Sequence, residues 1–184
     1  FLGCAAAYVL ASGDRTILRS FGRPEQGAMR LPLLLGGGVF LLLLGGYTQL
    51  SPWLDLSAIS GNLQAKEGFT AATFPLAALY ITFGNSLLEE LFFRGFAFLA
   101  LYRSGYKKLA WTFSAIAFAL YHVSIMDGWF HPALLVLLTS GLACAGLLFN
   151  ALDAKSQTIW PGWLVHMGAN LAINTIALHL WGII

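Results

Sequence analysis

Long apolar runs separated by short polar breaks make up most of the chain. A helix that crosses a bilayer needs about 20 mostly apolar residues. Five runs of about this length follow one another: Leu31 to Leu50, Thr70 to Tyr102, Leu109 to Met126, Pro132 to Asn150 and Thr158 to Ile184. The pattern predicts an all-α fold, a polytopic transmembrane helix bundle with about five complete spans.

Two segments depart from this simple pattern. Phe1 to Ala11 is apolar and has no basic residues before it, whereas a signal peptide has a charged leader. We expect an N-terminal helix remnant here, and a single membrane-embedded domain over residues 1–184 that is truncated at its N-terminus. The run from Thr70 to Tyr102 is longer than a bilayer requires, so we expect it to tilt, to kink near Pro75 or to project past the membrane.

Composition agrees with a lipid environment. Hydrophobic residues make up 58% of the chain and charged residues only 10%, where a soluble domain carries roughly 25%. The net charge of +2 is small and no Lys/Arg stripe is present, so we expect the lipid bilayer and no nucleic acid as a partner. Cys4 and Cys144 both lie in apolar segments, which predicts small buried side chains that stay reduced.

Basic residues gather in two breaks between apolar runs. The first break holds Arg15, Arg19, Arg23 and Arg30, and the second holds Arg103, Lys107 and Lys108. In the last break Asp153 and Lys155 cancel. The positive-inside rule places the two basic breaks in the cytoplasm. Because the loops are short, we expect a multi-pass integral protein of a bacterial inner (cytoplasmic) membrane.

The segment "LLEELFFRGF" places three charged residues in an apolar run. A charged side chain near the bilayer centre costs at least about 2.5 kcal/mol on insertion scales, so it usually faces a protein interior or a water-filled cavity. Glu90 and Arg94 are four residues apart and can pair on one helix face. Glu89 lies about 100 degrees around the helix and has no such partner. One glutamate is thus paired and the other is left for another role.

A second polar group is "FALYH", in which Phe118 and His122 share a helix face. Glu89 and His122 each lie ~20 Å along their helices from the basic loop between them, at 1.5 Å per residue. Because consecutive spans are antiparallel, these two side chains could meet at one depth.

A third polar group is "HMGAN" in the last run. His166 and Asn170 share a face, and Gly168 between them leaves room for a close approach of a backbone or a substrate. Taken singly, each polar group has an ordinary explanation: an interfacial ion pair, a hydrogen-bonded interior histidine or an amide that joins two helices. Together they indicate a common site. We assign His131 and His179 structural roles, and leave open whether Asn85 and Ser86 line the site or only pack beside it.

The ordered set EExxxR, FxxxH and HxxxN resembles the CPBP intramembrane protease family, which includes type II CAAX prenyl endopeptidases and bacterial Abi-like proteins. The resemblance implies a glutamate-dependent, metal-independent endopeptidase that cleaves membrane-associated peptides or proteins. Glu89 would be the general base and His122 its partner in holding the water, while His166 and Asn170 would stabilise the oxyanion. Glu90, Arg94 and Phe118 would support them, Arg94 by holding Glu90 and Phe118 by packing.

Several alternatives stay open at this point. No cofactor and no metal is expected, although zinc bound by Glu89, His122 and His166 is chemically feasible. The sequence has no HExxH, GxGD or GxSG motif of the other intramembrane proteases. A noncatalytic membrane scaffold or bacteriocin-immunity protein could share the fold. A proton-coupled transporter would have inverted repeats, which are not found. Whether a substrate would be prenylated is also open.

Overall fold

The computed structural model describes residues 3, 7, 9–11, 16–53, 56, 59, 61, 63–65, 68–126 and 128–184. The N-terminal remnant expected over Phe1 to Ala11 falls largely outside this set, as does Cys4. Within the set the chain forms seven α-helices and no strand, which confirms the all-α prediction. The short 3₁₀ helix η1 (Thr16–Phe21) precedes the first long helix.

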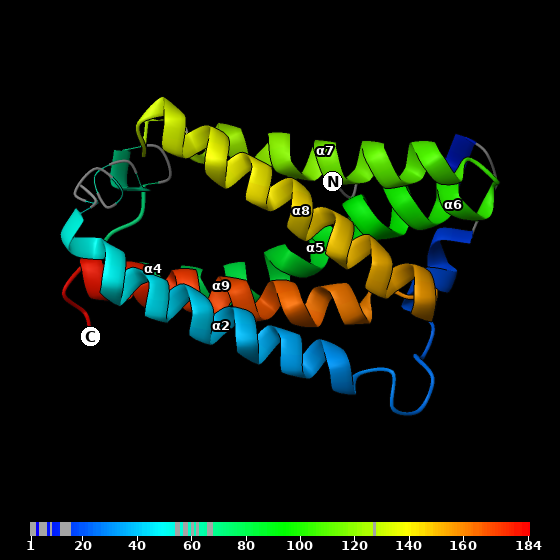
Figure 1. Ribbon diagram of the computed structural model, residues 1–184, viewed down its shortest axis with the longest axis horizontal. Coiled ribbons are helices and arrows are strands. Elements are labelled where there is room, and N and C mark those ends of the chain that lie inside the picture. Colours follow the sequence, from blue (N-terminus) through cyan, green and yellow to red (C-terminus); the bar gives the residue numbers. More distant parts are fainter. Residues whose placement is uncertain are drawn as a thin grey trace.

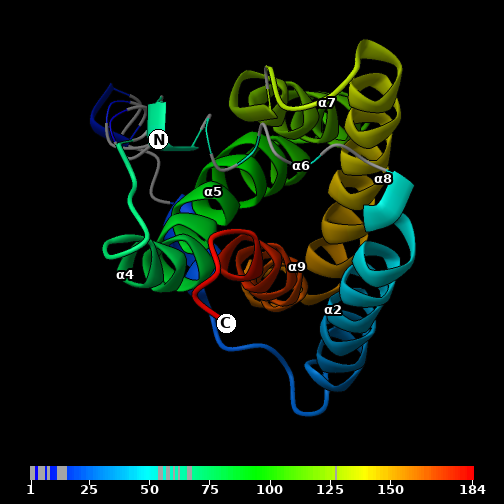
Figure 2. The ribbon, with the colours of Figure 1, turned by 90° about the vertical axis from the view of Figure 1, so that its left-hand side faces the viewer.

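Four long helices and one broken helix form the bundle. The four are α2 (Arg30–Leu50), α7 (Lys107–Met126), α8 (Pro132–Ser156) and α9 (Trp160–Leu180). α2 packs along α9 and α7 packs along α8 (Figure 1). In the end-on view of Figure 2, α9 lies between α4 and α2, and it also contacts α5 and α8. The last helix is therefore at the centre of the bundle.

Four helical segments of the described chain are long and apolar enough to cross a membrane: Arg30–Leu50, Phe74–Arg103, Lys107–Met126 and Pro132–Ser156. The fifth predicted span is α9, which has 21 residues but is not among them. Its His166, Asn170 and Asn174 lower the mean hydropathy. Two of these, His166 and Asn174, are buried inside the protein, so the polarity of α9 is directed at its neighbours.

The third predicted span is a continuous helix with changing geometry. It consists of α4 (Phe74–Leu79), η3 (Tyr80–Asn85), α5 (Ser86–Glu90), η4 (Leu91–Ala100) and α6 (Leu101–Arg103). The segments η3 and η4 are π-helical, with wider turns than an α-helix, and π-turns often occur at functional sites. The helix begins at Phe74, after the expected Thr70, and Pro75 lies in its first turn, where proline is tolerated without a kink.

Side chains of α9 bind the end of α4 and the π-helical segment η3. The amide of Asn174 donates to the carbonyl oxygen of Ala78 at 3.0 Å and to the hydroxyl of Thr82 at 2.9 Å. The amide of Asn170 donates to the carbonyl oxygen of Ile81 at 3.2 Å. Wide turns leave backbone carbonyl groups that need partners in an apolar environment. The stripe of amides on α9 supplies them and fixes η3 against the central helix.

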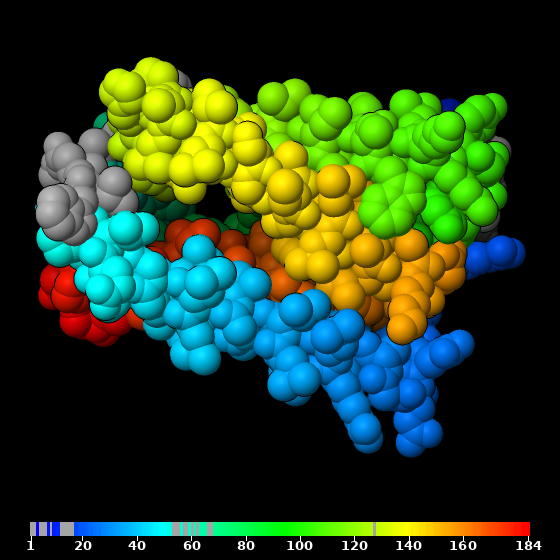
Figure 3. Space-filling model, viewed as in Figure 1, coloured from blue at the N-terminus to red at the C-terminus, as the bar shows by residue number. Residues whose placement is uncertain are grey.

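Burial is uneven along α7 and α8. The buried residues of α7 end at Ala119, and those of α8 begin at Gly146. The facing halves of these two helices therefore contain no buried residue in the described chain. In Figure 3 a hollow is visible between the beginning of α8 (yellow) and the C-terminal half of α2 (cyan). α7 and α8 are thus closely packed over only part of their length, while α4 and α9 bury a separate core cluster that includes Phe74, Ala78 and Ala177.

Two residues behave differently from the sequence-based expectation. Cys144 is free and exposed on α8, although its apolar segment predicted burial. A lipid-facing helix surface accepts a small apolar thiol as readily as a core does. Asp153 was expected in a loop beside Lys155, but it is fully buried in the last turn of α8. Lys155 stays exposed, so the two charges do not cancel at the surface.

The closest helix packing occurs between two glycines. A Cβ atom added at Gly168 would lie 2.8 Å from the carbonyl carbon and 2.9 Å from the α-carbon of Gly36. The two backbones touch because neither residue has a side chain, which agrees with the close approach predicted at Gly168. This contact sets the distance between α2 and α9.

We predict that Gly168→Ala separates α2 from α9 and lowers the free energy of unfolding by about 1–3 kcal/mol, the usual range for overpacking. The measurement is denaturant unfolding in detergent micelles. The matched control is Gly38→Ala on α2, where an added Cβ has nothing within 4 Å. Equal stability of the two variants would contradict the prediction.

Candidate active site

Glu89 lies in α5, between the two π-helical segments, and is 3% exposed. One carboxylate oxygen, Oε1, accepts a hydrogen bond from the amide of Asn85 one turn earlier. The other oxygen, Oε2, is buried and has no hydrogen-bond partner among the described residues. Burying a carboxylate oxygen without a donor costs free energy, so Oε2 is the atom of this site at which a donor would bind most favourably.

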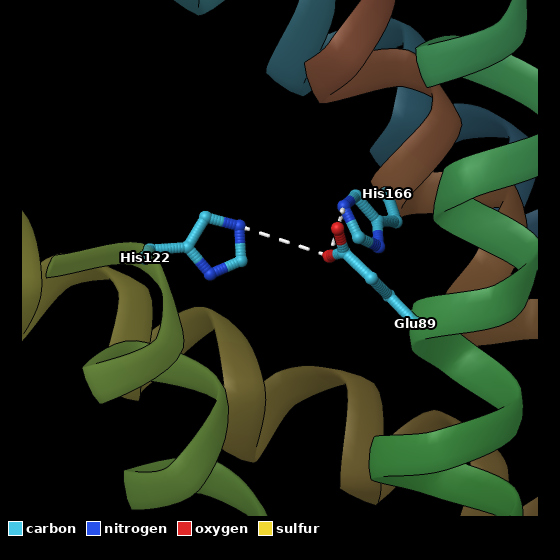
Figure 4. Close-up of side chains that lie close together, drawn as sticks. All are labelled: Glu89, His122 and His166. Carbon is cyan, nitrogen blue, oxygen red and sulfur yellow. Dashed lines mark ion pairs between the residues drawn. The ribbon is translucent and has the colours of Figure 1, made fainter. Parts of the chain in front are cut away.

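Two imidazole rings face this oxygen from different helices (Figure 4). The Nε2 atom of His122, on α7, is 3.8 Å from Glu89 Oε2, and the Nε2 atom of His166, on α9, is 3.7 Å from it. His166 is almost buried, with 5% of its side chain exposed, and His122 is 19% exposed. Three of the four residues that sequence reasoning made catalytic therefore come together, and the site is reached from the side of His122.

The second nitrogen of each ring determines its orientation. His122 Nδ1 is 2.8 Å from the carbonyl oxygen of Phe118, which can only accept a hydrogen bond. Nδ1 of His122 therefore carries the hydrogen, and in the neutral ring Nε2 offers a lone pair to the site. His166 Nδ1 is 2.8 Å from Glu90 Oε1, so an ionised Glu90 orients the second ring in the same way.

Glu90 and Arg94 form a fully buried ion pair behind the imidazoles. Arg94 Nη1 is 3.4 Å from Glu90 Oε1, and both side chains have 0% exposure. The guanidinium carbon lies 4.0 Å from the ring centroid of Phe118 and 4.9 Å from that of Phe149. These cation–π contacts and the charge of Glu90 hold Arg94 in an apolar surrounding. The i,i+4 pairing expected from the sequence is present in the structure.

Phe118 packs against both imidazoles and the buried cation of the site. Its ring centroid is 4.5 Å from that of His122 and 5.6 Å from that of His166, besides its contact with Arg94. The residue is 2% exposed. One aromatic ring therefore separates the two imidazoles from the buried cation.

Asn170 is the predicted site residue that the structure leaves outside the carboxylate–imidazole group. Its amide donates to the backbone of Ile81, as described above, and an amide nitrogen has a second hydrogen for another acceptor.

Sequence reasoning left Asn85 undecided and missed Asn174. Both follow the same signal that revealed the others, a spacing of four residues: Asn85 with Glu89, and Asn174 with Asn170. Ser86, the other undecided residue, accepts from the indole of Trp163 at 3.0 Å.

The same three residues form a group that could hold a metal ion. One ligand atom each from Glu89, His122 and His166 lies within 4.8 Å of the others. Three protein ligands of the carboxylate and imidazole type plus one open position are the pattern of catalytic zinc. The Nδ1 partners, Phe118 and Glu90, also match the outer hydrogen bonds of metal-bound histidines. The donor set fits zinc as well as it fits a water molecule.

The fold and the site define a membrane-embedded helical protein with a glutamate–histidine centre. Residues 71–172, more than half of the chain, match the family described as type II CAAX prenyl endopeptidase Rce1-like. The chain belongs to this family, which confirms the resemblance drawn from the three motifs, and all of those motifs lie inside the matched region. No curated protein and no solved structure matches the chain.

We predict that Arg94→Ala destabilises the protein by about 3–5 kcal/mol, because it leaves the carboxylates of Glu90 and Asp153 buried without their cation. Unfolding in detergent micelles measures the effect. Lys108→Ala removes an exposed cation instead and should change stability by less than about 0.5 kcal/mol. A loss in Arg94→Ala no larger than that of the control would show that the buried cation is dispensable.

Proposed function

We propose that the protein is an intramembrane endopeptidase, in which Glu89 activates a water molecule to hydrolyse peptide bonds of membrane-associated peptides or proteins. Family membership gives the coarser statement, a protein of the CAAX prenyl endopeptidase family. The single observation that supports the finer one is the unpartnered Glu89 Oε2 with two imidazole nitrogens 3.7 and 3.8 Å away.

The reason lies in the count of donors and acceptors. An ionised Glu89 Oε2 is an acceptor, and each neutral imidazole oriented by its Nδ1 hydrogen presents an acceptor at Nε2. Three acceptors that face one another need a donor between them. A water molecule supplies two O–H groups and would be held with its oxygen available for attack. Such a water is also a candidate nucleophile beside a general base.

The proposed reaction is an addition followed by an elimination. Glu89 takes one proton from the water while the water oxygen bonds to the carbonyl carbon of the scissile peptide, and the carbonyl π electrons move to its oxygen. The C–N bond then breaks as Glu89 returns the proton to the leaving nitrogen. The products are a carboxylic acid and an amine, and Glu89 ends as the carboxylate that began the cycle. His122 holds the water by its Nε2 lone pair.

The oxyanion needs donors, and two residues can supply them. In this proposal the neutral His166 takes up one proton from solvent when substrate binds, so that Nε2 donates to the oxyanion while its Nδ1 hydrogen stays bonded to an ionised Glu90, 2.8 Å away. His166 releases the proton to solvent when the oxyanion collapses. Asn170 has the second hydrogen of its amide nitrogen. Donors fixed in an apolar site act strongly on developing charge because little reorganisation is needed. In this proposal Glu90 and Arg94 keep the charge of His166 balanced.

A zinc-dependent hydrolase is the second candidate, since the ligand atoms of Glu89, His122 and His166 lie close enough to hold one ion. The three residues would then be ligands, and the ion would supply an activated water. A chelator separates the two candidates without any change to the chain.

For the membrane orientation we propose that the basic end of the bundle faces the cytoplasm of a bacterial inner membrane. Arg103, in the second basic break, donates to Ser20 at 3.3 Å, close to Arg19 in the first. Both basic breaks therefore lie at one end of the bundle, as the positive-inside rule requires. The proposed substrate is a peptide or protein anchored in this membrane, prenylated or not.

We predict that purified wild-type protein cleaves members of a membrane-peptide library and that Glu89→Gln abolishes the cleavage, because the amide cannot take a proton from water. A fall of at least about a hundredfold is expected for the loss of a general base. The measurement is product formation by mass spectrometry, in matched prenylated and unprenylated peptides, with and without a strong chelator.

The control is Glu25→Gln, the same chemical change at an exposed glutamate, which should leave the rate unchanged. Cleavage that survives the chelator and is lost in Glu89→Gln supports the glutamate mechanism. Cleavage that the chelator removes supports zinc. A folded wild type that cleaves nothing, whether or not zinc is added, would argue against both hydrolase proposals.

A further inference from the structure

Asp153 is a buried acid that the proposed mechanism does not use and that no sequence motif contains. It lies in the last turn of α8 and has 0% exposure. An ionised carboxylate in an apolar bundle needs a partner, because its desolvation costs several kcal/mol. The contacts of Asp153 therefore indicate what the residue does.

Its first contact joins α8 to α9. Asp153 Oδ1 accepts a hydrogen bond from the backbone N–H of Gly162, in the first turn of α9, at 2.8 Å. The turn between the helices places Gln157 in the left-handed region at φ 57°, which brings the start of α9 back beside α8. An acidic group at the N-terminus of a helix is stabilised by the unpaired N–H groups there. Asp153 thereby fixes where the helix that carries His166 begins.

Its second contact is with the ion pair behind the site. A Cβ atom added at Gly162 would lie 2.8 Å from Asp153 Oδ2 and 3.0 Å from Glu90 Oε2, so both carboxylates face one glycine. The charges of Glu90, Asp153 and Glu89 all act on that of Arg94. Within the described chain, neither of these two oxygens nor any guanidinium nitrogen of Arg94 has a hydrogen-bond partner. Asp153 and Glu90 are therefore two of the three carboxylates whose charges share this cation.

This sharing affects His166 through a single atom. Glu90 Oε1 is 2.8 Å from His166 Nδ1 and 3.4 Å from Arg94 Nη1, so the imidazole and the guanidinium compete for the same oxygen. An ionised Asp153 would attract Arg94 and weaken its hold on Glu90, besides repelling the carboxylate of Glu90. Without that charge the guanidinium would bind Glu90 more closely, and the hydrogen bond from His166 Nδ1 would lengthen.

We propose that Asp153 is a positioning residue: by sharing Arg94 with Glu90 and by fixing the start of α9, it keeps Glu90 Oε1 on the Nδ1 atom of His166. The consequence for catalysis rests on the proposed endopeptidase function, in which His166 stabilises the oxyanion. The consequence for the ring of His166 does not depend on that function.

The test is Asp153→Asn, which keeps an oxygen for the N–H of Gly162 and removes only the charge. We expect kcat to fall about tenfold with KM unchanged, as is usual when the partner of a site histidine is disturbed. We also expect the NMR signal of the His166 ring nitrogen Nδ1, assigned by its absence in His166→Gln, to shift toward a weaker hydrogen bond.

The matched control is Asn150→Ala, one turn earlier on α8. Asn150 is equally buried, and its amide group bonds to Ser114 and to the carbonyl oxygen of Trp111, away from Glu90 and Arg94. This variant should lose stability but keep the kcat of the folded protein and the His166 signal. A purely structural role for Asp153 would make the two variants behave alike.

The outcomes separate the two proposals. An unchanged His166 signal in folded Asp153→Asn overturns the positioning role whatever the activity is. A shifted signal with wild-type kcat overturns its part in catalysis. A shifted signal in a protein whose wild type cleaves nothing keeps the positioning role and removes the endopeptidase proposal. A shifted signal with reduced kcat and constant KM supports both.

Discussion

The buried ion pair of Glu90 and Arg94 is the interaction on which the rest of the structure depends. Both side chains have 0% exposure in a bundle whose surface is apolar. Each ion taken out of water costs several kcal/mol, so the helices must pack in the one register that gives both charges their partners. His166 of α9 takes one oxygen of Glu90, and Phe118 of α7 covers the guanidinium. The pair thereby draws together the helices that carry the candidate catalytic side chains.

Such a register requires that backbones come close at particular points, and glycines stand there. Gly162 leaves space for two carboxylates, and Gly36 and Gly168 allow α2 and α9 to touch. In a membrane, helices gain little from hydrophobic burial against one another, so packing at small residues and polar contacts between helices determine the arrangement. The amides of Asn170 and Asn174 on α9 belong to the same system, because they bind carbonyl groups of the wide turns that precede Glu89. The position of Glu89 thus depends on α9 as much as on its own helix.

Much of this could be predicted from the sequence, and the rest could not for definite physical reasons. Apolar runs predicted the helices, and a spacing of four residues predicted the pair Glu90 and Arg94. A depth argument that assumed straight, antiparallel α-helices predicted that Glu89 and His122 meet, and they do so although η3 and η4 are π-helical. The same assumption could not reveal those wide turns or the amides that bind them. Asp153 was assigned to a loop because hydropathy falls near it, whereas it is buried in the structure beside Gly162 and Glu90. Glu90 is 63 positions earlier in the chain, and a sequence pattern does not reveal a neighbour that is close only in space.

The centre brings three hydrogen-bond acceptors together when Glu89 is ionised and both imidazoles are neutral. Phe118 and Glu90 each bind the Nδ1 atom of an imidazole, and this leaves both Nε2 atoms directed at an unpartnered oxygen of Glu89. The two Nε2 atoms lie 3.7 and 3.8 Å from Glu89 Oε2, and three such acceptors repel one another unless a proton, a water molecule or a cation lies among them. The protein tolerates the repulsion between these acceptors because the surrounding contacts hold each group in place. Unfavourable local arrangements that the surrounding structure maintains are common at functional sites. Rotation of one imidazole, so that its N–H donates to Glu89 Oε2, would remove this repulsion. The ion pair behind His166 keeps the Nδ1 atom of that ring on Glu90, so the same buried charges that set the helix register also orient the site.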